Sequence, residues 1–130
     1  MASSPTILYI DNEINNLISF GALFRREYKI IPASSVTEAL TVLKNGLVEI
    51  IICSKNLNGM SGIEFLRLTI SMYPNSTRLL VSDYINLDTE NKAQIFNYLI
   101  KPWDEVKIRQ ILKEAHALFE IKEIISKNSW

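Results

Sequence analysis

Apolar residues occur along the chain in short runs, and polar segments with scattered apolar positions separate these runs. The runs lie at 6–10, 28–33, 48–53, 78–81 and 97–100 and are rich in β-branched residues, which predicts five strands. In the segments between them, apolar residues recur every three or four positions, which is typical of helices that bury one face. Strands that alternate with helices predict a parallel sheet with right-handed crossovers and helices on both faces, a doubly wound α/β fold.

The most continuous apolar run, at 48–53, stops at Ser54 and turns through Gly59 and Gly62 into a helical pattern. Such a run, bounded by turn signals, is typical of a strand that is buried on both faces of a parallel sheet. In open α/β sheets, functional sites lie just beyond the carboxyl ends of the strands. Ser54 therefore marks the expected centre of the site.

Several helix boundaries are also visible. Ser35 and Glu38 form a capping box before the second helix, and Asp104 is expected to cap the last helix. A third helix is expected from 62 to about 72. The segment between 85 and 96 is polar and weakly periodic, so any fourth helix there is short or irregular.

Composition narrows the function classes. The chain has 130 residues, enough for one domain with a real core, and its formal net charge is zero. This balance implies no general attraction to nucleic acid or to an anionic membrane. No signal peptide and no membrane-spanning stretch is visible, and the single Cys53 has no partner for an internal disulfide. A soluble, cytoplasmic, single-domain protein is expected.

Polar side chains follow four of the five expected strands, at the points where these strands end. They are Asp11, Asn12, Glu13, Ser54, Asn56, Ser82, Asp83 and Lys101. Carboxylate and carbonyl oxygens suit a divalent cation, and a hydroxyl with an ammonium group suits a phosphoryl group. We also expect Asp11 or Asn12 to cap the first helix, with Glu13 in its first turn.

Four motifs, each at a strand end and in the same order along the chain, carry a resemblance to a known family. They are 7–13 (ILYIDNE), 59–66 (GMSGIEFL), Val81-Ser82 and 98–103 (YLIKPW). Over about 6–119 the chain resembles the receiver domain of two-component response regulators, which has the flavodoxin-like fold of the chemotaxis type. The resemblance implies a phosphorelay signalling domain that is not an enzyme.

In that family an aspartate at the end of the third strand accepts a phosphoryl group, and an acidic pair after the first strand holds magnesium. The resemblance places Ser54 at the acceptor position and Asp11 with Asn12 at the acidic pair. Asn56 would offer its backbone carbonyl to the metal. No cofactor is assigned, and magnesium binding is expected to be weak because Ser54 and Asn12 are neutral.

The remaining family positions are better matched. Ser82 corresponds to the hydroxyl that contacts the phosphoryl group, Lys101 to the partner lysine and Tyr98 to the aromatic switch. The acceptor position that Lys101 would face carries Ser54 and no carboxylate in this sequence. We therefore expect either that Lys101 forms an ion pair with Asp11 or that Asp11 keeps a residual ability to bind a cation.

The last helix is longer than one domain normally needs. We place a receiver-like domain at 1–119 and an extension of the last helix at 120–130. Apolar positions 108, 111, 115, 118 and 125 follow a spacing of three and four, and Lys122 interrupts this seam. The extension is expected either to link or dimerise the domain or to fray as a tail.

Three hypotheses follow. The first is a pseudo-receiver that acts through protein partners, either a signalling component or its own output domain, without aspartyl phosphorylation. The second is a receiver that still responds to phosphate or magnesium through non-standard residues. The third, a flavodoxin-like domain that binds a small molecule or nucleotide, lacks support because no glycine-rich loop follows the first strand.

Overall fold

The computed structural model describes residues 4–83 and 93–128. The strands are β1 (Thr6–Ile10), β2 (Lys29–Ala33), β3 (Ile50–Ser54), β4 (Thr77–Ser82) and β5 (Ile95–Ile100). The helices are α1 (Ile14–Phe24), α2 (Val36–Lys44), α3 (Gly62–Met72) and α4 (Glu105–Asn128). The strands form one sheet in the order β2-β1-β3-β4-β5, and all four pairings are parallel. The predicted flavodoxin-like α/β fold is confirmed.

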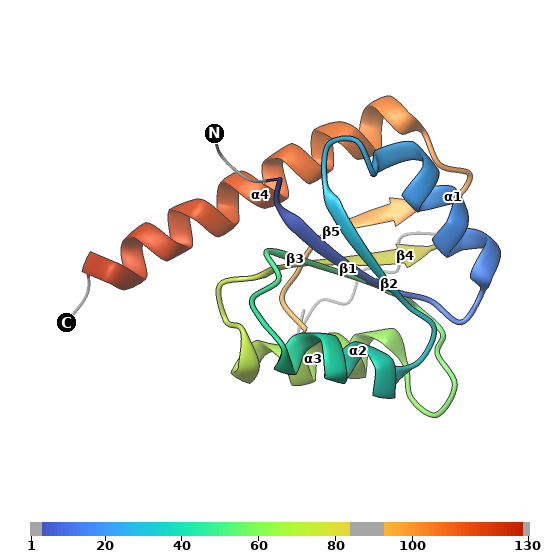
Figure 1. Ribbon diagram of the computed structural model, residues 1–130, viewed down its shortest axis with the longest axis horizontal. Coiled ribbons are helices and arrows are strands. Elements are labelled where there is room, and N and C mark those ends of the chain that lie inside the picture. Colours follow the sequence, from blue (N-terminus) through green and yellow to red (C-terminus); the bar gives the residue numbers. More distant parts are fainter. Residues whose placement is uncertain (1–3, 84–92, 129–130) are drawn as a thin grey trace.

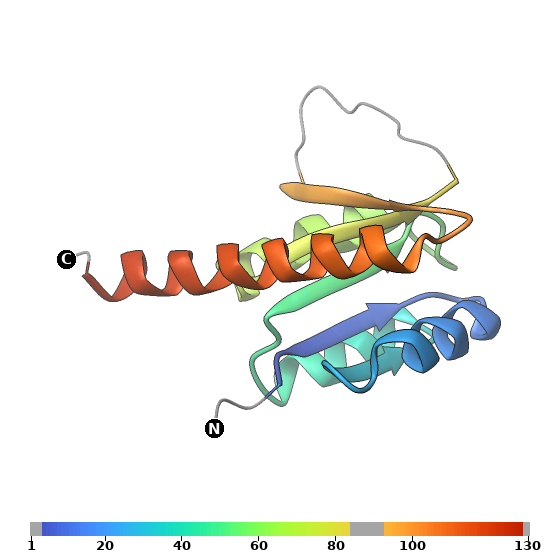
Figure 2. The same cartoon turned by 90° about the horizontal axis from the view of Figure 1, so that it is seen from above.

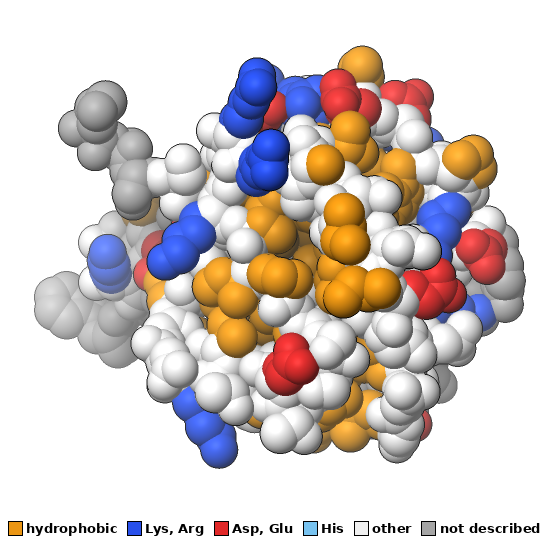
Figure 3. Space-filling model, turned by 45° about the vertical axis from the view of Figure 1, so that its right-hand side comes forward, with side chains coloured by type: hydrophobic (Ala, Val, Ile, Leu, Met, Phe, Trp, Pro, Cys, Tyr) orange, Lys and Arg blue, Asp and Glu red, His pale blue; other side chains and the backbone are white. Residues whose placement is uncertain are grey.

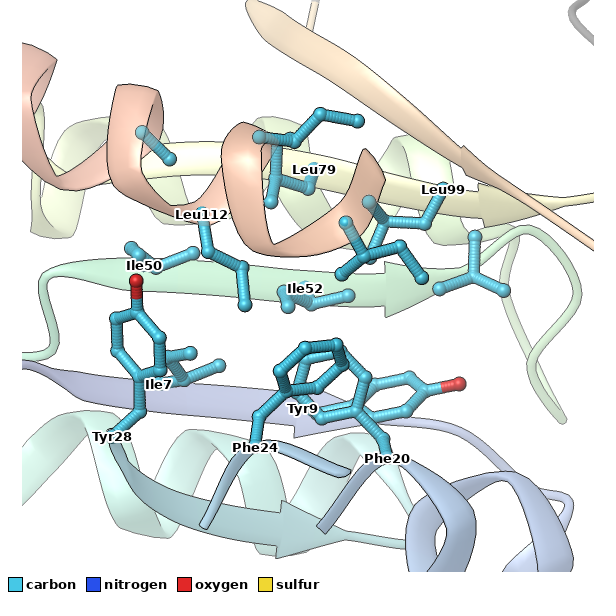
Figure 4. Close-up of a cluster of buried hydrophobic side chains, with 14 of the residues drawn as sticks. Ile7, Tyr9, Phe20, Phe24, Tyr28, Ile50, Ile52, Leu79, Leu99 and Leu112 are labelled. Carbon is cyan, nitrogen blue, oxygen red and sulfur yellow. The ribbon is translucent and has the colours of Figure 1, made fainter. Parts of the chain in front are cut away.

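Helices cover both faces of the sheet (Figure 1). α1 and α4 lie on one face, where side chains such as Tyr9, Phe20, Ile52 and Leu112 form one apolar core (Figure 4). α2 and α3 lie on the other face, over a second core that includes Phe65. The sheet is therefore enclosed between two helical layers, which explains why the inner strands β1 and β3 are apolar and buried over most of their length.

The helix caps agree with the sequence at two positions and differ at a third. The hydroxyl of Ser35 accepts a hydrogen bond from the backbone of Glu38 at 3.1 Å, and Asp104 Oδ1 accepts one from the backbone of Lys107 at 3.2 Å. The prediction that Asp11 or Asn12 caps α1 is wrong. Glu13 holds the cap position instead of lying in the first turn, and its side chain makes no capping bond. The chain remains extended through Glu13, so Asp11 and Asn12 lie before the cap position.

The segment 85–96, where the sequence predicts at most a short or irregular fourth helix, lies outside the described residues up to 92, and its last two residues belong to β5. β5 begins at Ile95, two residues before the predicted strand, so the end of the polar segment already belongs to the sheet. Ile95 is buried and Phe96 is exposed, as expected for successive residues of a strand that lies at the edge of the sheet.

α4 runs from the carboxyl edge of the sheet to the opposite edge and projects beyond it (Figure 2). Its buried side chains are Ile108, Ile111, Leu112, Ala115 and Phe119. Three positions of the predicted apolar seam are thus used inside the domain rather than on a free face. No helix in the described part of the chain is both long enough and apolar enough to cross a membrane.

Candidate functional site

A pocket of about 380 Å³ lies at the carboxyl ends of the central strands. Its lining residues are Asn12, Glu13, Ser54, Lys55, Asn56, Val81, Ser82, Asp83 and Lys101. Seven of them are among the polar residues that the sequence predicted to converge here. The prediction that these strand ends share one site is therefore supported by their arrangement, while the role of each side chain stays a prediction.

The β3–α3 loop packs closely around Ser54. The backbone of Gly62 donates to the carbonyl of Lys55 at 2.8 Å, and the backbone of Lys55 donates to the carbonyl of Val81 at 3.0 Å. A Cβ atom at Gly62 would lie 2.0 Å from the carbonyl oxygen of Ser54. Only a residue without a side chain fits at this point, so Gly62 fixes the path of the chain that leaves β3.

Ser82 and Lys101 are joined through the backbone. The amide of Lys101 donates to the carbonyl of Ser82 at 3.1 Å, which continues the β4–β5 ladder past Ile100. The peptide bond between Lys101 and Pro102 is cis. Ser82 and Lys101 both line the same pocket.

Asp11 has a different environment from the other predicted site residues. It is fully buried and is not among the described residues that line the pocket. Its Oδ2 accepts from the Tyr9 hydroxyl at 2.6 Å and from Asn16 Nδ2 at 3.0 Å, and its Oδ1 accepts from the backbone of Glu13 at 2.9 Å. Within the described residues no ion pair joins Asp11 to Lys101, so the expected pair is not formed.

Tyr9 is one of the residues at this site that sequence reasoning missed, together with Lys55 in the pocket lining and Asn16 beside Asp11. Its side chain is fully buried between Phe20 and Trp103, with ring centroids at 5.1 Å and 6.3 Å. Burial, reinforced by the hydrogen bond to Asp11, raises the pKa of the Tyr9 hydroxyl. The sequence could have predicted this contact. Residues two apart in a strand point to the same side of the sheet, so Tyr9 is expected on the same side as Asp11.

The charges of the pocket itself balance. Glu13 and Asp83 are the acidic lining residues, and Lys55 and Lys101 are the basic ones. No group of three or more His, Cys, Asp or Glu side chains in the described residues is arranged to hold a metal ion. Asn12, Ser54 and Asn56, which stand at the positions where the family resemblance places the metal, are neutral, and these three residues fit magnesium poorly because magnesium is usually held by one or two carboxylates. The carboxylates among the described lining residues belong to Glu13 and Asp83, which the resemblance does not place at the metal.

Tyr98 lies outside this pocket. It lines a neighbouring groove between β5 and α4, of about 260 Å³, which also contains Lys101 and Ile108. Its ring is partly buried against the core beneath α2 and α3. Lys101 thus borders both cavities, and Tyr98 borders only the second.

Comparison with known proteins agrees with this architecture. Residues 7–113 match the family described as the response regulator receiver domain. The hydrogenase transcriptional regulatory protein HoxA of Bradyrhizobium diazoefficiens is 25% identical over 127 residues, which make up 95% of this chain and 26% of HoxA. The transcriptional regulatory protein ZraR of Klebsiella oxytoca is 29% identical over 121 residues, which make up 90% of this chain and 27% of ZraR. The chain spans about a quarter of the length of these curated relatives.

Solved structures show the same fold. The signal receiver domain of an HD domain-containing protein from Pseudomonas fluorescens has a TM-score of 0.85 and 25% identity, over 95% of this chain and 94% of that chain. A CheY-like receiver domain from Methanospirillum hungatei has a TM-score of 0.83 and 22% identity, over 92% of this chain and 99% of that chain. With the family match over residues 7–113, these findings show that the chain belongs to the response regulator receiver domain family, the signalling domains of two-component systems.

Proposed function

We propose that this chain is a pseudo-receiver, a receiver domain that signals through protein contacts without aspartyl phosphorylation. The observation that supports the proposal is the position of Ser54. It ends β3 and lines the same pocket as Ser82 and Lys101, at the place where the family resemblance puts the phosphoryl-accepting aspartate.

The chemistry of Ser54 supports the same conclusion. A serine hydroxyl is a weak nucleophile unless an adjacent base removes its proton. In the described part of the chain, no hydrogen bond joins the Ser54 hydroxyl to a carboxylate or to the lone His116. Transfer from a phosphohistidine to Ser54 would therefore lack the activation that this chemistry requires.

Signalling without phosphate requires a contact surface, and α1 offers one. Ile14 and Ile18, one turn apart, are 63% and 64% exposed. Together with Leu17 and Pro32 they line a shallow groove of about 240 Å³. Figure 3 shows apolar side chains gathered at the centre of one face, with charged side chains around them. We propose a protein partner here, either a signalling component or an output domain, and no contact of this domain with nucleic acid or membrane.

The end of α4 is a second candidate surface. Ile121 and Ile124 are 53% and 60% exposed, and both lie in the extension that we assign to 120–130. Asn75 Nδ2 donates to Glu123 Oε2 at 2.6 Å and to Ser126 Oγ at 3.0 Å, so the extension is held by the α3–β4 loop. We propose that this held, apolar helix end supports homodimerisation.

The experiment that tests the proposal is intact-mass measurement after incubation with magnesium and acetyl phosphate. The native chain is expected to keep its mass. Ser54→Asp and the double variant Asn12→Asp/Ser54→Asp serve as controls, since they return carboxylates to the acceptor and metal positions. If either variant gains one phosphoryl group while the native chain does not, the pseudo-receiver is supported. A gain of mass by the native chain overturns it.

A second function is favoured by the pocket itself. Ser82 and Lys101 could hold a phosphate-like anion without a covalent bond, because a hydroxyl and an ammonium group both stabilise anionic oxygens. This alternative predicts magnesium-dependent binding of inorganic phosphate by calorimetry, and loss of that binding in Lys101→Ala. Unchanged binding in Lys101→Ala would count against it.

A further inference from the structure

The carboxylate of Asp11 is occupied by donors from its own domain. Both oxygens accept hydrogen bonds, Oδ2 from the Tyr9 hydroxyl and Asn16 Nδ2, and Oδ1 from the backbone of Glu13. The residue has no exposed surface. Three donors on two oxygens leave little room for a further ligand, since an ionised carboxylate offers about four lone-pair sites in all.

The strongest of these donors is itself fixed in place. Tyr9 has no exposed surface, and its ring contacts Phe20 and Trp103 in edge-to-face geometry, with interplanar angles of 70° and 61°. Figure 4 shows the Tyr9 ring lying along the sheet, with its hydroxyl directed toward the carboxyl ends of the strands. The short distance of 2.6 Å to Asp11 Oδ2 is typical of a hydroxyl bound to an ionised carboxylate.

The second donor completes the enclosure from α1. Asn16 Nδ2 bonds to Asp11 Oδ2 at 3.0 Å and also to Glu13 Oε2 at 3.3 Å. One amide group therefore connects the buried Asp11 with Glu13, an acidic residue of the pocket lining. A cation that approached Asp11 Oδ2 would have to displace both Tyr9 and Asn16.

We propose that Tyr9 and Asn16 withhold Asp11 from divalent cations, so that this receiver domain works without magnesium. The two residues determine which ligands the site accepts, because their hydrogen bonds occupy the carboxylate of Asp11 inside the domain and keep it from binding a cation. The inference rests on the proposed function in one respect, the neutral side chains of Asn12 and Ser54. It goes beyond the proposed function by naming Tyr9 and Asn16 as the residues that keep Asp11 from a cation.

A magnesium titration tests the inference. Affinity is measured by calorimetry and by the indole N–H resonance of Trp103, in a Trp130→Phe background that leaves one tryptophan. The native chain and the double variant Asn12→Asp/Ser54→Asp are compared with the same double variant carrying Tyr9→Phe or Asn16→Ala. Tyr28→Phe in the double variant is the matched control, since Tyr28 belongs to the same core but does not bind Asp11.

The native chain is expected to show no saturable magnesium binding. Tyr9→Phe is expected to raise the affinity of the double variant about tenfold, the scale on which residues that orient metal ligands act. Asn16→Ala is expected to raise it less, and Tyr28→Phe to leave it unchanged. Asn16 is only partly buried, so Asn16→Ala is expected to fold. Asn16→Ala therefore still tests the inference if Tyr9→Phe does not fold.

Two results would overturn the inference. One is saturable magnesium binding by the native chain, and the other is equal affinity of the double variant with and without the changes at Tyr9 and Asn16. Neither result depends on phosphoryl transfer. The proposed function fails instead when the native chain gains mass from acetyl phosphate, so the two failures are distinguishable.

Discussion

The guanidinium group of Arg78 binds Thr69 twice, through Nε to the side-chain oxygen at 2.9 Å and through Nη2 to the carbonyl oxygen at 3.1 Å. Further bonds reach the carbonyls of Ser76, at 2.7 Å, and Tyr73. Arg78 is 1% exposed, and burial lowers its pKa to about 10. It remains charged at neutral pH, where a cation beside the last carbonyls of α3 is favourable.

Replacing Arg78 tests this arrangement. Arg78→Met removes the charge and leaves the carbonyls of Thr69 and Ser76 without their donors, so the free energy of unfolding is expected to fall by about 3 kcal/mol. Urea unfolding measures the change. Arg67→Met, at an exposed position of α3, is the control and is expected to change stability by less than about 0.5 kcal/mol. Equal losses in both variants would contradict the role assigned to Arg78.

Two glycines make a matched pair for the packing around the pocket. A Cβ at Gly62 would meet the carbonyl oxygen of Ser54 at 2.0 Å, whereas one at Gly21 would meet nothing within 4 Å. Gly62→Ala is expected to destabilise the domain by about 2 kcal/mol or more through overpacking. Gly21→Ala, inside α1, is expected to stabilise it by up to about 1 kcal/mol. Thermal unfolding of both variants checks the prediction, which fails if they shift the midpoint in the same direction.

The proposed dimer gives a prediction about charge on α4. Ile121→Glu/Ile124→Glu places two carboxylates on the exposed helix end and is expected to shift the protein to monomer in sedimentation experiments. Val106→Glu is the control, because Val106 is 75% exposed at the other end of the same helix. Dimer that persists in the first variant, or is lost in both, would refute an interface at the helix end.

Alkaline pH should weaken the fold through Tyr28. Burial, with Glu27 nearby, raises the pKa of Tyr28, so the neutral hydroxyl is favoured in the folded state. Its contribution to stability is fully present below the unfolded pKa of about 10 and is lost as pH rises toward the folded value, by up to about 1.4 kcal/mol per pH unit. Urea unfolding between pH 8 and 11 measures this slope. Tyr28→Phe should have the shallower slope, and identical slopes would exclude this contribution.

The fold was predictable because each strand is a separate apolar run. β1 has the predicted bounds, and β4 differs by one residue at each end. β5 was predicted too short because its first residues follow a polar segment and its side chains alternate in exposure. The helices cover the faces of this edge strand less completely than those of the central β3, so β5 carries a weaker apolar signal.

The sequence predicted which residues lie at the site better than it predicted the contacts that these residues make. The pattern of strand ends brought Ser54, Ser82 and Lys101 into one pocket, because parallel strands end at the same edge. The hydrogen bonds of Asp11 were not foreseen, since they depend on the rotamers of Tyr9 and Asn16 and on how tightly the aromatic core holds them. Charge pairing with Lys101 was the simpler expectation from sequence alone.

The continuity of α4 gives the domain a mechanical property. A helix of 24 residues is about 36 Å long, and a tilt of about 5° around its packed first half would move the far end by roughly 2 Å. The bonds from Asn75 to Glu123 and Ser126 would resist such a tilt. A small tilt at the start of α4 would therefore become a larger displacement at its far end, and the bonds from Asn75 would limit that displacement.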